Sequence, residues 1–270
     1  MTSATPRSAD GILDRPALGW ILRAGTFCCF LGHGMLGVSQ LAAWTSYFGV
    51  VGIGPERALA LMPWVGWFDV AMAISVLVLP VRWVVLYMVF WTVWTALLRP
   101  LAGESFWEAV ERAGNYGVPF ALFLLMAPAG SLRAWFRGVG DPQTRARVVH
   151  WTLRLTTGLL LFGHGMLNWV VTKPLFVNHY AVLDLPGLPT ERVVGVFECL
   201  LALAVLCKPD HRLLIAVAIW KAATELLNPM AGSPFWVFIE HGGSYAAPLA
   251  LAFLVARSRA AAPAAAAATP

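Results

Sequence analysis

The sequence predicts an all-α fold: a polytopic membrane bundle of about eight transmembrane helices, arranged as two parallel four-helix repeats. Three observations predict it, namely the composition, the spacing of the apolar runs and an internal duplication. Of the 270 residues, 59% are apolar and only 12% are charged, and the mean hydropathy is +0.70. A soluble domain is typically about 45–50% apolar and about 25% charged, so a soluble enzyme is excluded. Four cysteines are too few for a disulfide scaffold.

Apolar runs long enough to cross a bilayer recur along the chain. A membrane helix needs roughly 17–25 largely apolar residues, because about 30 Å of hydrocarbon must be crossed. Residues 1–17 contain no such run, so we expect a tail there and no cleaved signal peptide. The expected spans are Leu18–Gln40, Ala60–Leu79, Val81–Leu98, Asn115–Ala129, Val149–Val171, Val193–Leu206, Leu213–Leu227 and Ser244–Val255.

The distribution of basic residues predicts the orientation of these spans. Cytoplasmic loops of multi-pass membrane proteins carry an excess of Lys and Arg. With both termini on one side, that side receives most of the 19 basic residues. The opposite side receives only Arg57, Arg99, Arg112, Lys173 and Arg192. We therefore expect a multi-pass protein of a bacterial-type inner (cytoplasmic) membrane, with both termini in the cytoplasm. The net charge of +5 is then a topology signal, and nucleic acid is not an expected partner.

The chain also repeats itself with a shift of 129–131 residues. Gly32-His33-Gly34 recurs as Gly163-His164-Gly165, and Asp69 corresponds to Glu198. Because each unit has an even number of spans, both units insert with the same orientation. The predicted organisation is a cytoplasmic tail (1–17), a first repeat (18–131), a basic cytoplasmic linker (132–148), a second repeat (149–257) and a low-complexity tail (258–270).

Ionisable residues inside the spans are the candidate site. Each costs at least ~2.5–3.5 kcal/mol at the centre of a membrane helix, so it is retained with a partner or a function. Counting 1.5 Å per residue places His33 and Asp69 at matching depth in the outer half of the bilayer. It does the same for His164 and Glu198, so we expect two His–acid pairs. The alternative is that each histidine only satisfies a hydrogen bond at a close helix crossing.

The second unit carries a further charged pair. Lys221 and Glu225 are four residues apart on one helix face and can pair. Their counterparts Thr92 and Ala96 are uncharged, so the second unit is the better candidate for chemistry if only one unit is active. The polar groups expected at the outer mouth are Glu111, Arg112, Asn115, Tyr116, Glu240, His241, Ser244 and Tyr245. Of these, Tyr116, Tyr245 and His241 join the candidate site. The His and Cys spacings match no metal-binding motif, so no metal site is predicted.

The motif residues resemble a known family. The stretch Leu153–Gly165 resembles the opening helix of the DoxX-like family of four-helix membrane proteins, and Gly195-Val196-Phe197-Glu198 resembles its acidic second helix. The chain looks like a tandem duplication of such a unit. The resemblance implies a quinone-linked redox role, as in the membrane subunit of a thiosulfate:quinone oxidoreductase. A quinone would take a hydrogen bond from a donor such as His164 and exchange protons with an acid such as Glu198.

Two classes of function remain open on the sequence alone. In the first, the protein is a membrane oxidoreductase component that binds a quinone, with a soluble or membrane redox partner and the lipid bilayer around it. Haem held by the two histidines is a less favoured alternative. In the second, the protein is a small-solute or ion transporter. A non-catalytic membrane anchor subunit of an oxidoreductase is a third possibility. The expected catalytic residues are His164, Glu198, His33 and Asp69, and the expected cofactor-binding residues are Lys221, Glu225, Tyr245, Tyr116 and His241.

Overall fold

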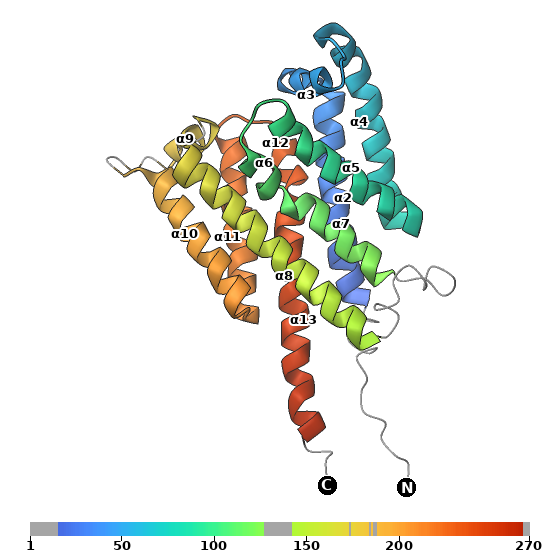
Figure 1. Ribbon diagram of the computed structural model, residues 1–270, viewed down its shortest axis with the longest axis vertical. Coiled ribbons are helices and arrows are strands. Elements are labelled where there is room, and N and C mark those ends of the chain that lie inside the picture. The colour runs from blue at the N-terminus through green and yellow to red at the C-terminus, as the bar shows by residue number, and fades with distance from the viewer. Residues whose placement is uncertain (1–15, 127–141, 173, 184, 186–187, 267–270) are drawn as a thin grey trace.

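The protein is all-helical. The computed structural model describes residues 16–126, 142–172, 174–183, 185 and 188–266, and no strand occurs among them. The predicted all-α class is confirmed (Figure 1). The long helices are α2 (Pro16–Val38), α4 (Pro55–Val78), α5 (Arg82–Leu101), α7 (Ala113–Leu125), α8 (Pro142–Met166), α10 (Thr190–Cys207), α11 (His211–Met230) and α13 (Gly242–Ala266).

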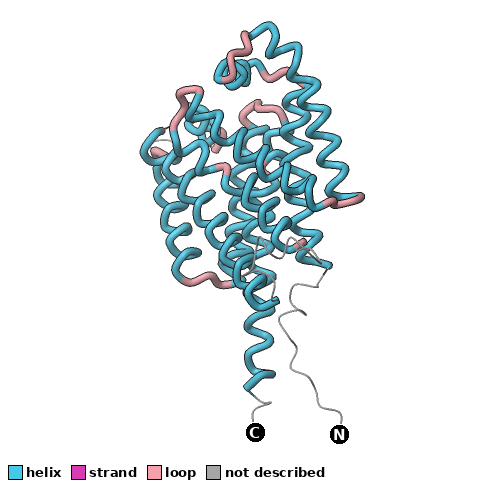
Figure 2. Tube along the Cα trace, turned by 45° about the vertical axis from the view of Figure 1, so that its right-hand side comes forward, coloured by secondary structure: helices cyan, strands magenta, loops and turns pink. Residues whose placement is uncertain are grey.

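Short helices cluster at one end of the bundle. They are the 3₁₀ turn η1 (Ala42–Trp44), α3 (Thr45–Val50), α6 (Phe106–Glu111), the π-helical turn η3 (Leu167–Val171), α9 (Pro174–Ala181) and α12 (Phe235–Glu240). Figure 1 shows α3, α6, α9 and α12 at the upper end, whereas α2 begins and α13 ends toward the lower end. The long helices run side by side between these ends, and most loops lie where helices end (Figure 2).

Five of the described stretches are long and apolar enough to cross a membrane. They are α2, α4, α5, α11 and the stretch Phe235–Ser258, which joins α12 to α13. These helices support a multi-pass membrane protein. Three of the eight expected spans are not among these five stretches of the described part: α7 has 13 residues, α10 carries Glu191, Arg192 and Glu198 within its 18, and α8 carries His150, Arg154 and His164 among its apolar residues. Eight spans therefore remain a prediction.

Helix ends differ from the predicted unit boundaries. Helix α8 begins at Pro142, inside the predicted linker 132–148, and α13 continues to Ala266, inside the predicted tail 258–270. Proline suits the first turn of a helix because it needs no amide hydrogen there, and α4 likewise begins at Pro55. Alanine has the highest helix propensity, which explains the extension of α13. Residues 1–15 and 127–141 lie outside the described part of the chain.

Glycines allow each histidine-bearing helix to pack closely on the next long helix. A Cβ atom on Gly34 would lie 2.7 Å from the carbonyl oxygen of Gly66, which brings α2 against α4. A Cβ atom on Gly165 would lie 2.7 Å from the carbonyl oxygen of Gly195, which brings α8 against α10. Such short contacts are possible only without side chains. The glycine that follows each histidine therefore brings the acid-bearing helix within reach.

The glycine that precedes each histidine makes a different contact. A Cβ atom on Gly32 would collide with the backbone of Glu240, so α2 packs on α12. A Cβ atom on Gly163 would collide with the backbone of Glu111, so α8 packs on α6. Each short helix thus lies against a long helix from the other half of the chain. Each histidine is therefore flanked by two close crossings, one within its half and one between halves.

Candidate functional site

The first His–acid pair joins α2 to α4. His33 Nδ1 lies 2.8 Å from Asp69 Oδ2, and Asp69 is completely buried. The imidazole stacks on Trp44, with 4.5 Å between ring centroids. The predicted contact between His33 and Asp69 is therefore present. The pair is partly accessible through His33, whose side chain is 17% exposed.

The second His–acid pair joins α8 to α10 and is more enclosed. His164 Nδ1 is hydrogen-bonded to Glu198 Oε2, and Asn168 Nδ2 lies 3.1 Å from the same ring nitrogen. The indole nitrogen of Trp220 donates a hydrogen bond of 3.0 Å to Glu198 Oε1. Both carboxylate oxygens of Glu198 therefore accept a hydrogen bond, and the predicted contact is present here too.

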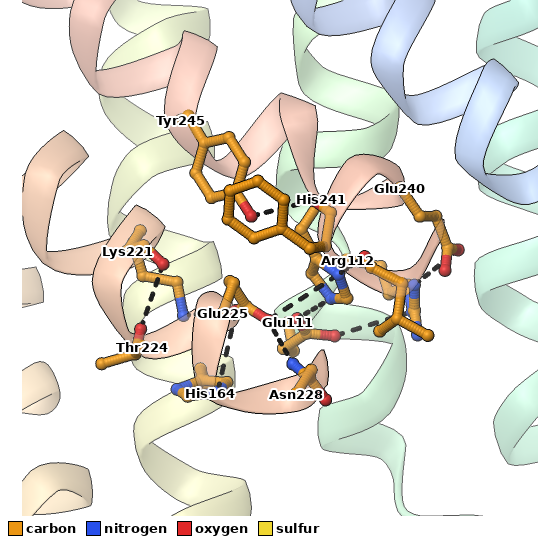
Figure 3. Close-up of polar contacts among 12 residues, drawn as sticks. Glu111, Arg112, His164, Lys221, Thr224, Glu225, Asn228, Glu240, His241 and Tyr245 are labelled. Carbon is orange, nitrogen blue, oxygen red and sulfur yellow. Dashed lines mark hydrogen bonds and ion pairs between the residues drawn. The ribbon is translucent and has the colours of Figure 1, made fainter. Parts of the chain in front are cut away.

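Lys221 connects the second pair to Glu225. Its Nζ atom lies 2.9 Å from Glu225 Oε1 and 3.5 Å from Glu198 Oε1. The predicted Lys221–Glu225 pair is thus present, and the lysine also faces the second acid. His164 Nε2 lies 4.0 Å from Glu225 Oε1 (Figure 3). These four side chains form one buried charged group.

This charged group continues toward α6 and α12. His241 Nδ1 lies 3.7 Å from Glu225 Oε2, and His241 Nε2 lies 3.4 Å from Glu111 Oε1. Arg112 lies 3.6 Å from Glu111 and donates a hydrogen bond of 2.7 Å to Glu240 Oε1. We call the following eight side chains the charged cluster: Glu111, Arg112, His164, Glu198, Lys221, Glu225, Glu240 and His241. Figure 3 labels all of them except Glu198.

Sequence reasoning placed Glu111, Arg112 and Glu240 only at the outer mouth and did not include them in the site. The contacts of Arg112 with Glu240 and of His241 with Glu111 join residues about one repeat apart. In the sequence, the matched positions Glu111 and Glu240 are the only signal that could have identified them.

Two predicted cofactor-binding residues have structural contacts instead. The hydroxyl of Tyr116 donates to the carbonyl oxygen of Ala109 over 3.3 Å, and that of Tyr245 donates to the carbonyl oxygen of Phe238 over 2.9 Å. Each tyrosine thereby links α7 or α13 to the short helix before it. Both tyrosine side chains therefore stabilise the packing of neighbouring helices in this structure.

A cavity of about 140 Å³ lies beside the first His–acid pair. It lies between α2, α3, α4 and α5, and its wall is mainly aromatic and aliphatic. Its polar lining comes mainly from His33, Asp69 and Arg99, and the aromatic lining includes Trp44, Tyr47, Phe48, Trp91 and Trp94. An apolar cavity of about 150 Å³ accommodates one benzene molecule. The cavity is therefore large enough for a single six-membered ring.

Two buried polar atoms of residues lining the cavity have no hydrogen-bond partner among the described residues. They are Asp69 Oδ1, an acceptor, and Trp91 Nε1, a donor. An unsatisfied buried polar group costs about 1–3 kcal/mol, so native proteins rarely retain one without a reason. A hydroxyl group donates one hydrogen bond and accepts others, so a hydroxyl-bearing ligand offers a partner of the kind that each atom lacks.

Tyr47 lines the cavity and is hydrogen-bonded to Glu104, which lies outside the lining. The Tyr47 hydroxyl donates a hydrogen bond to Glu104 Oε1, and the buried Arg99 guanidinium lies 5.3 Å from the Tyr47 ring centroid. Burial raises the pKa of Tyr47 to about 12; Arg99 opposes this rise, and the hydrogen bond to Glu104 adds to it. The hydroxyl therefore remains protonated at neutral pH and holds Glu104 in place.

Three members of the charged cluster have the geometry of metal ligands. Glu111, Glu225 and His241 each place one ligand atom within 4.8 Å of the other two, and all three residues are buried. They come from three separate segments, so no local spacing motif marks them. The prediction of no metal site considered only ligands that are close together in the sequence, so it did not test this arrangement.

Comparisons with known proteins do not assign a family. No family model matches the chain, and no curated protein and no solved structure matches it significantly.

Proposed function

We propose that the chain is a quinone-linked redox component of a bacterial-type inner membrane, with eight spans in two parallel units. The matched contacts on either side of His33 and His164 support the duplication. The resemblance to the DoxX-like family supports the quinone. In this proposal the short helices lie on the periplasmic side and both termini lie in the cytoplasm.

The single observation that carries the function is the unsatisfied pair in the cavity. Asp69 Oδ1 lacks a donor and Trp91 Nε1 lacks an acceptor among the described residues. A quinol hydroxyl supplies both, since its hydrogen binds the carboxylate and its oxygen accepts from the indole. The oxidised quinone has a carbonyl instead, which accepts from Trp91 but cannot donate to Asp69. The reduced form is therefore the better ligand.

The remaining lining suits a quinone ring. Trp44, Phe48 and Trp94 offer aromatic faces, and rings in offset or edge-to-face contact gain about 0.5–1.5 kcal/mol per pair. The volume of about 140 Å³ accommodates one ring, so an isoprenoid tail would extend out of the cavity toward lipid. A mostly apolar pocket with a few convergent polar groups is the usual form of a cofactor site.

The His33–Asp69 pair provides the proton chemistry. A quinol that is oxidised loses two electrons and two protons. Asp69 would accept the first proton at Oδ1 and release a proton from Oδ2 through His33, whose side chain is 17% exposed, to water, and the second proton would follow the same route. The electrons would pass to a redox partner protein. His164 and Glu198 have the same pairing, but Trp220 and Lys221 already occupy the Glu198 oxygen that corresponds to the open one of Asp69.

Ligand binding to the purified protein tests this function. A short-tail quinol is titrated into the protein in lipid nanodiscs, and quenching of tryptophan fluorescence gives the Kd. We expect one saturable site that Asp69→Asn and Trp91→Phe each weaken about 10- to 100-fold, because a hydrogen bond to a charged group contributes about 1.5–3 kcal/mol.

The matched controls are Trp83→Phe, on an exposed position of α5, and Asp210→Asn, at the start of α11. Both should bind like the unaltered protein. If the Asp69 and Trp91 variants bind quinol with the same affinity as these controls, the cavity is not the quinol site.

Transport is the second candidate, and one observation favours it. Helix α8 ends in a π-helical turn at Leu167–Val171, directly after His164, and Thr172 follows in the left-handed region with φ 51°. Irregular helical turns occur often at functional sites, and broken helices line the substrate sites of transporters. Saturable uptake of a small anion into proteoliposomes that contain the unaltered protein, with no uptake into protein-free liposomes, would favour transport over redox chemistry.

A further inference from the structure

A second candidate site lies in the charged cluster. Glu111, Glu225 and His241 belong to the end of α6, to α11 and to the junction of α12 with α13. None of the three lines the cavity beside His33. We propose that these three side chains bind one divalent transition-metal ion. The proposal is independent of the proposed quinol site.

The charges of the cluster call for additional positive charge. Four buried carboxylates belong to the cluster: Glu111, Glu198, Glu225 and Glu240. Arg112 and Lys221 contact them directly, and the buried Arg99 acts on Glu111 and Glu240 from farther away. With both imidazoles neutral, one carboxylate charge remains uncompensated, and uncompensated buried charge is very costly. A bound divalent cation compensates it in place of a proton on His241.

The orientation of His241 suits metal binding. Its Nδ1 atom lies 2.8 Å from the carbonyl oxygen of Val237 and donates a hydrogen bond to it, which leaves the Nε2 lone pair available. Histidines that bind metals nearly always donate their other ring N–H to a carbonyl or carboxylate in this way. His241 Nε2 lies 3.4 Å from Glu111 Oε1. Two ligands at about 2.1 Å from one tetrahedral ion are themselves separated by about 3.4 Å.

Glu225 is held in place as a third ligand. Its Oε2 atom accepts a hydrogen bond of 3.0 Å from Asn228, and its Oε1 atom accepts none from the described residues. Lys221 lies 2.9 Å from Oε1 as an ion pair, but it also lies 3.5 Å from Glu198. Lys221 therefore keeps a carboxylate partner when Glu225 binds a metal ion.

The ligand set defines the class of metal. One imidazole nitrogen with two carboxylates suits Zn²⁺, Co²⁺, Mn²⁺ or Fe²⁺, whereas Ca²⁺ and Mg²⁺ prefer oxygen alone and Cu⁺ prefers sulfur. Three protein ligands also leave a position on a tetrahedral ion for water or a small substrate.

Cobalt titration tests the proposal, because bound Co²⁺ has visible absorption bands that report the coordination geometry. Purified protein without a histidine tag is treated with a chelator, dialysed and titrated with CoCl₂, and elemental analysis gives the stoichiometry. We expect one equivalent of Co²⁺ that Zn²⁺ displaces. His241→Ala should abolish the bands, and Asn228→Ala should weaken binding about 10- to 100-fold, since it removes a partner of a ligand.

The matched control is His211→Ala, a histidine at the more exposed start of α11, which should bind Co²⁺ like the unaltered protein. The test does not depend on how well the variants fold, because the unaltered protein alone can refute the proposal. Absence of stoichiometric Co²⁺, Zn²⁺ and Mn²⁺ binding would overturn it. Co²⁺ binding that stays unchanged in a folded His241→Ala variant would also overturn the proposal.

Discussion

Trp220 Nε1 donates a hydrogen bond of 3.0 Å to Oε1 of Glu198. The corresponding residues 129 positions earlier, Trp91 and Asp69, leave the same two groups unsatisfied. Aspartate is one methylene shorter than glutamate, and Asp69 and Trp91 both line the cavity. In the second half the indole and the carboxylate thus satisfy each other, whereas in the first half Asp69 Oδ1 and Trp91 Nε1 have no partner among the described residues.

Exchanging Asp and Glu at positions 69 and 198 should exchange which of the two indole N–H groups is satisfied. Glu198→Asp withdraws the carboxylate from Trp220, so we expect a loss of about 1–3 kcal/mol from an unsatisfied indole N–H. Asp69→Glu should reach Trp91 and raise the melting temperature. Thermal unfolding in detergent measures both changes, with the exposed Glu56→Asp in α4 as the control. A stabilised Glu198→Asp variant would contradict the role of the Trp220 contact.

Removing the lysine of the charged cluster should be strongly destabilising. Lys221→Met leaves Glu198 and Glu225 without their shared cation, and breaking a buried ion pair from one side costs about 3–5 kcal/mol. The same substitution at the exposed Lys208 should have little effect. Denaturant titration of both variants in mixed micelles provides the comparison, and equal midpoints would argue against a buried ionic network.

The close packing of α8 on α6 can be tested by adding a methyl group at Gly163. Gly163→Ala would place a Cβ atom against the backbone of Glu111, and overpacking of this kind typically costs about 1–3 kcal/mol. Gly49 in α3 has no neighbouring atom within 4 Å of an added Cβ, so Gly49→Ala is the matched control. If both alanine variants melt at the same temperature, α6 does not pack on α8 as described.

Tyr47 in the lining of the cavity predicts a pH dependence at alkaline pH. The pKa of Tyr47 is raised to about 12, above the value of about 10 expected in the unfolded chain. The stabilising contribution of the Tyr47 hydroxyl is therefore fully present below pH 10 and is lost as the pH rises through about 12. The difference in tyrosinate absorbance between the unaltered protein and Tyr47→Phe during an alkaline titration measures this pKa. A midpoint near 10 would contradict the buried contact with Glu104.

The His–acid contacts could be predicted because depth in a membrane helix follows from residue count. Within the expected spans, His33 and Asp69 lie at similar distances from the outer end, and so do His164 and Glu198, although the helices α4 and α10 begin earlier than those spans. The helix ends were harder to predict, because hydropathy marks only the part of a helix that lies in lipid. Helix α8 begins in a polar stretch, where Pro142 was the available signal.

Two features of the site depend on tertiary structure and could not be derived from the chain alone. The contact of Arg112 with Glu240 depends on how the two halves dock. The cavity depends on how α2, α3, α4 and α5 pack against one another, and the sequence favoured the second half for chemistry because of Lys221. In the aligned repeats, Asp69 and Trp91 correspond to Glu198 and Trp220. The change from Asp to Glu was the sequence signal that the two halves differ at this site.

The most direct measurement is an experimental structure of the protein with a short-tail quinol bound. It should place the ring between Trp44 and Trp91, with one hydroxyl within hydrogen-bond distance of both Asp69 Oδ1 and Trp91 Nε1. A quinol bound elsewhere, with Asp69 and Trp91 hydrogen-bonded to each other or to water alone, would contradict the assignment of this cavity.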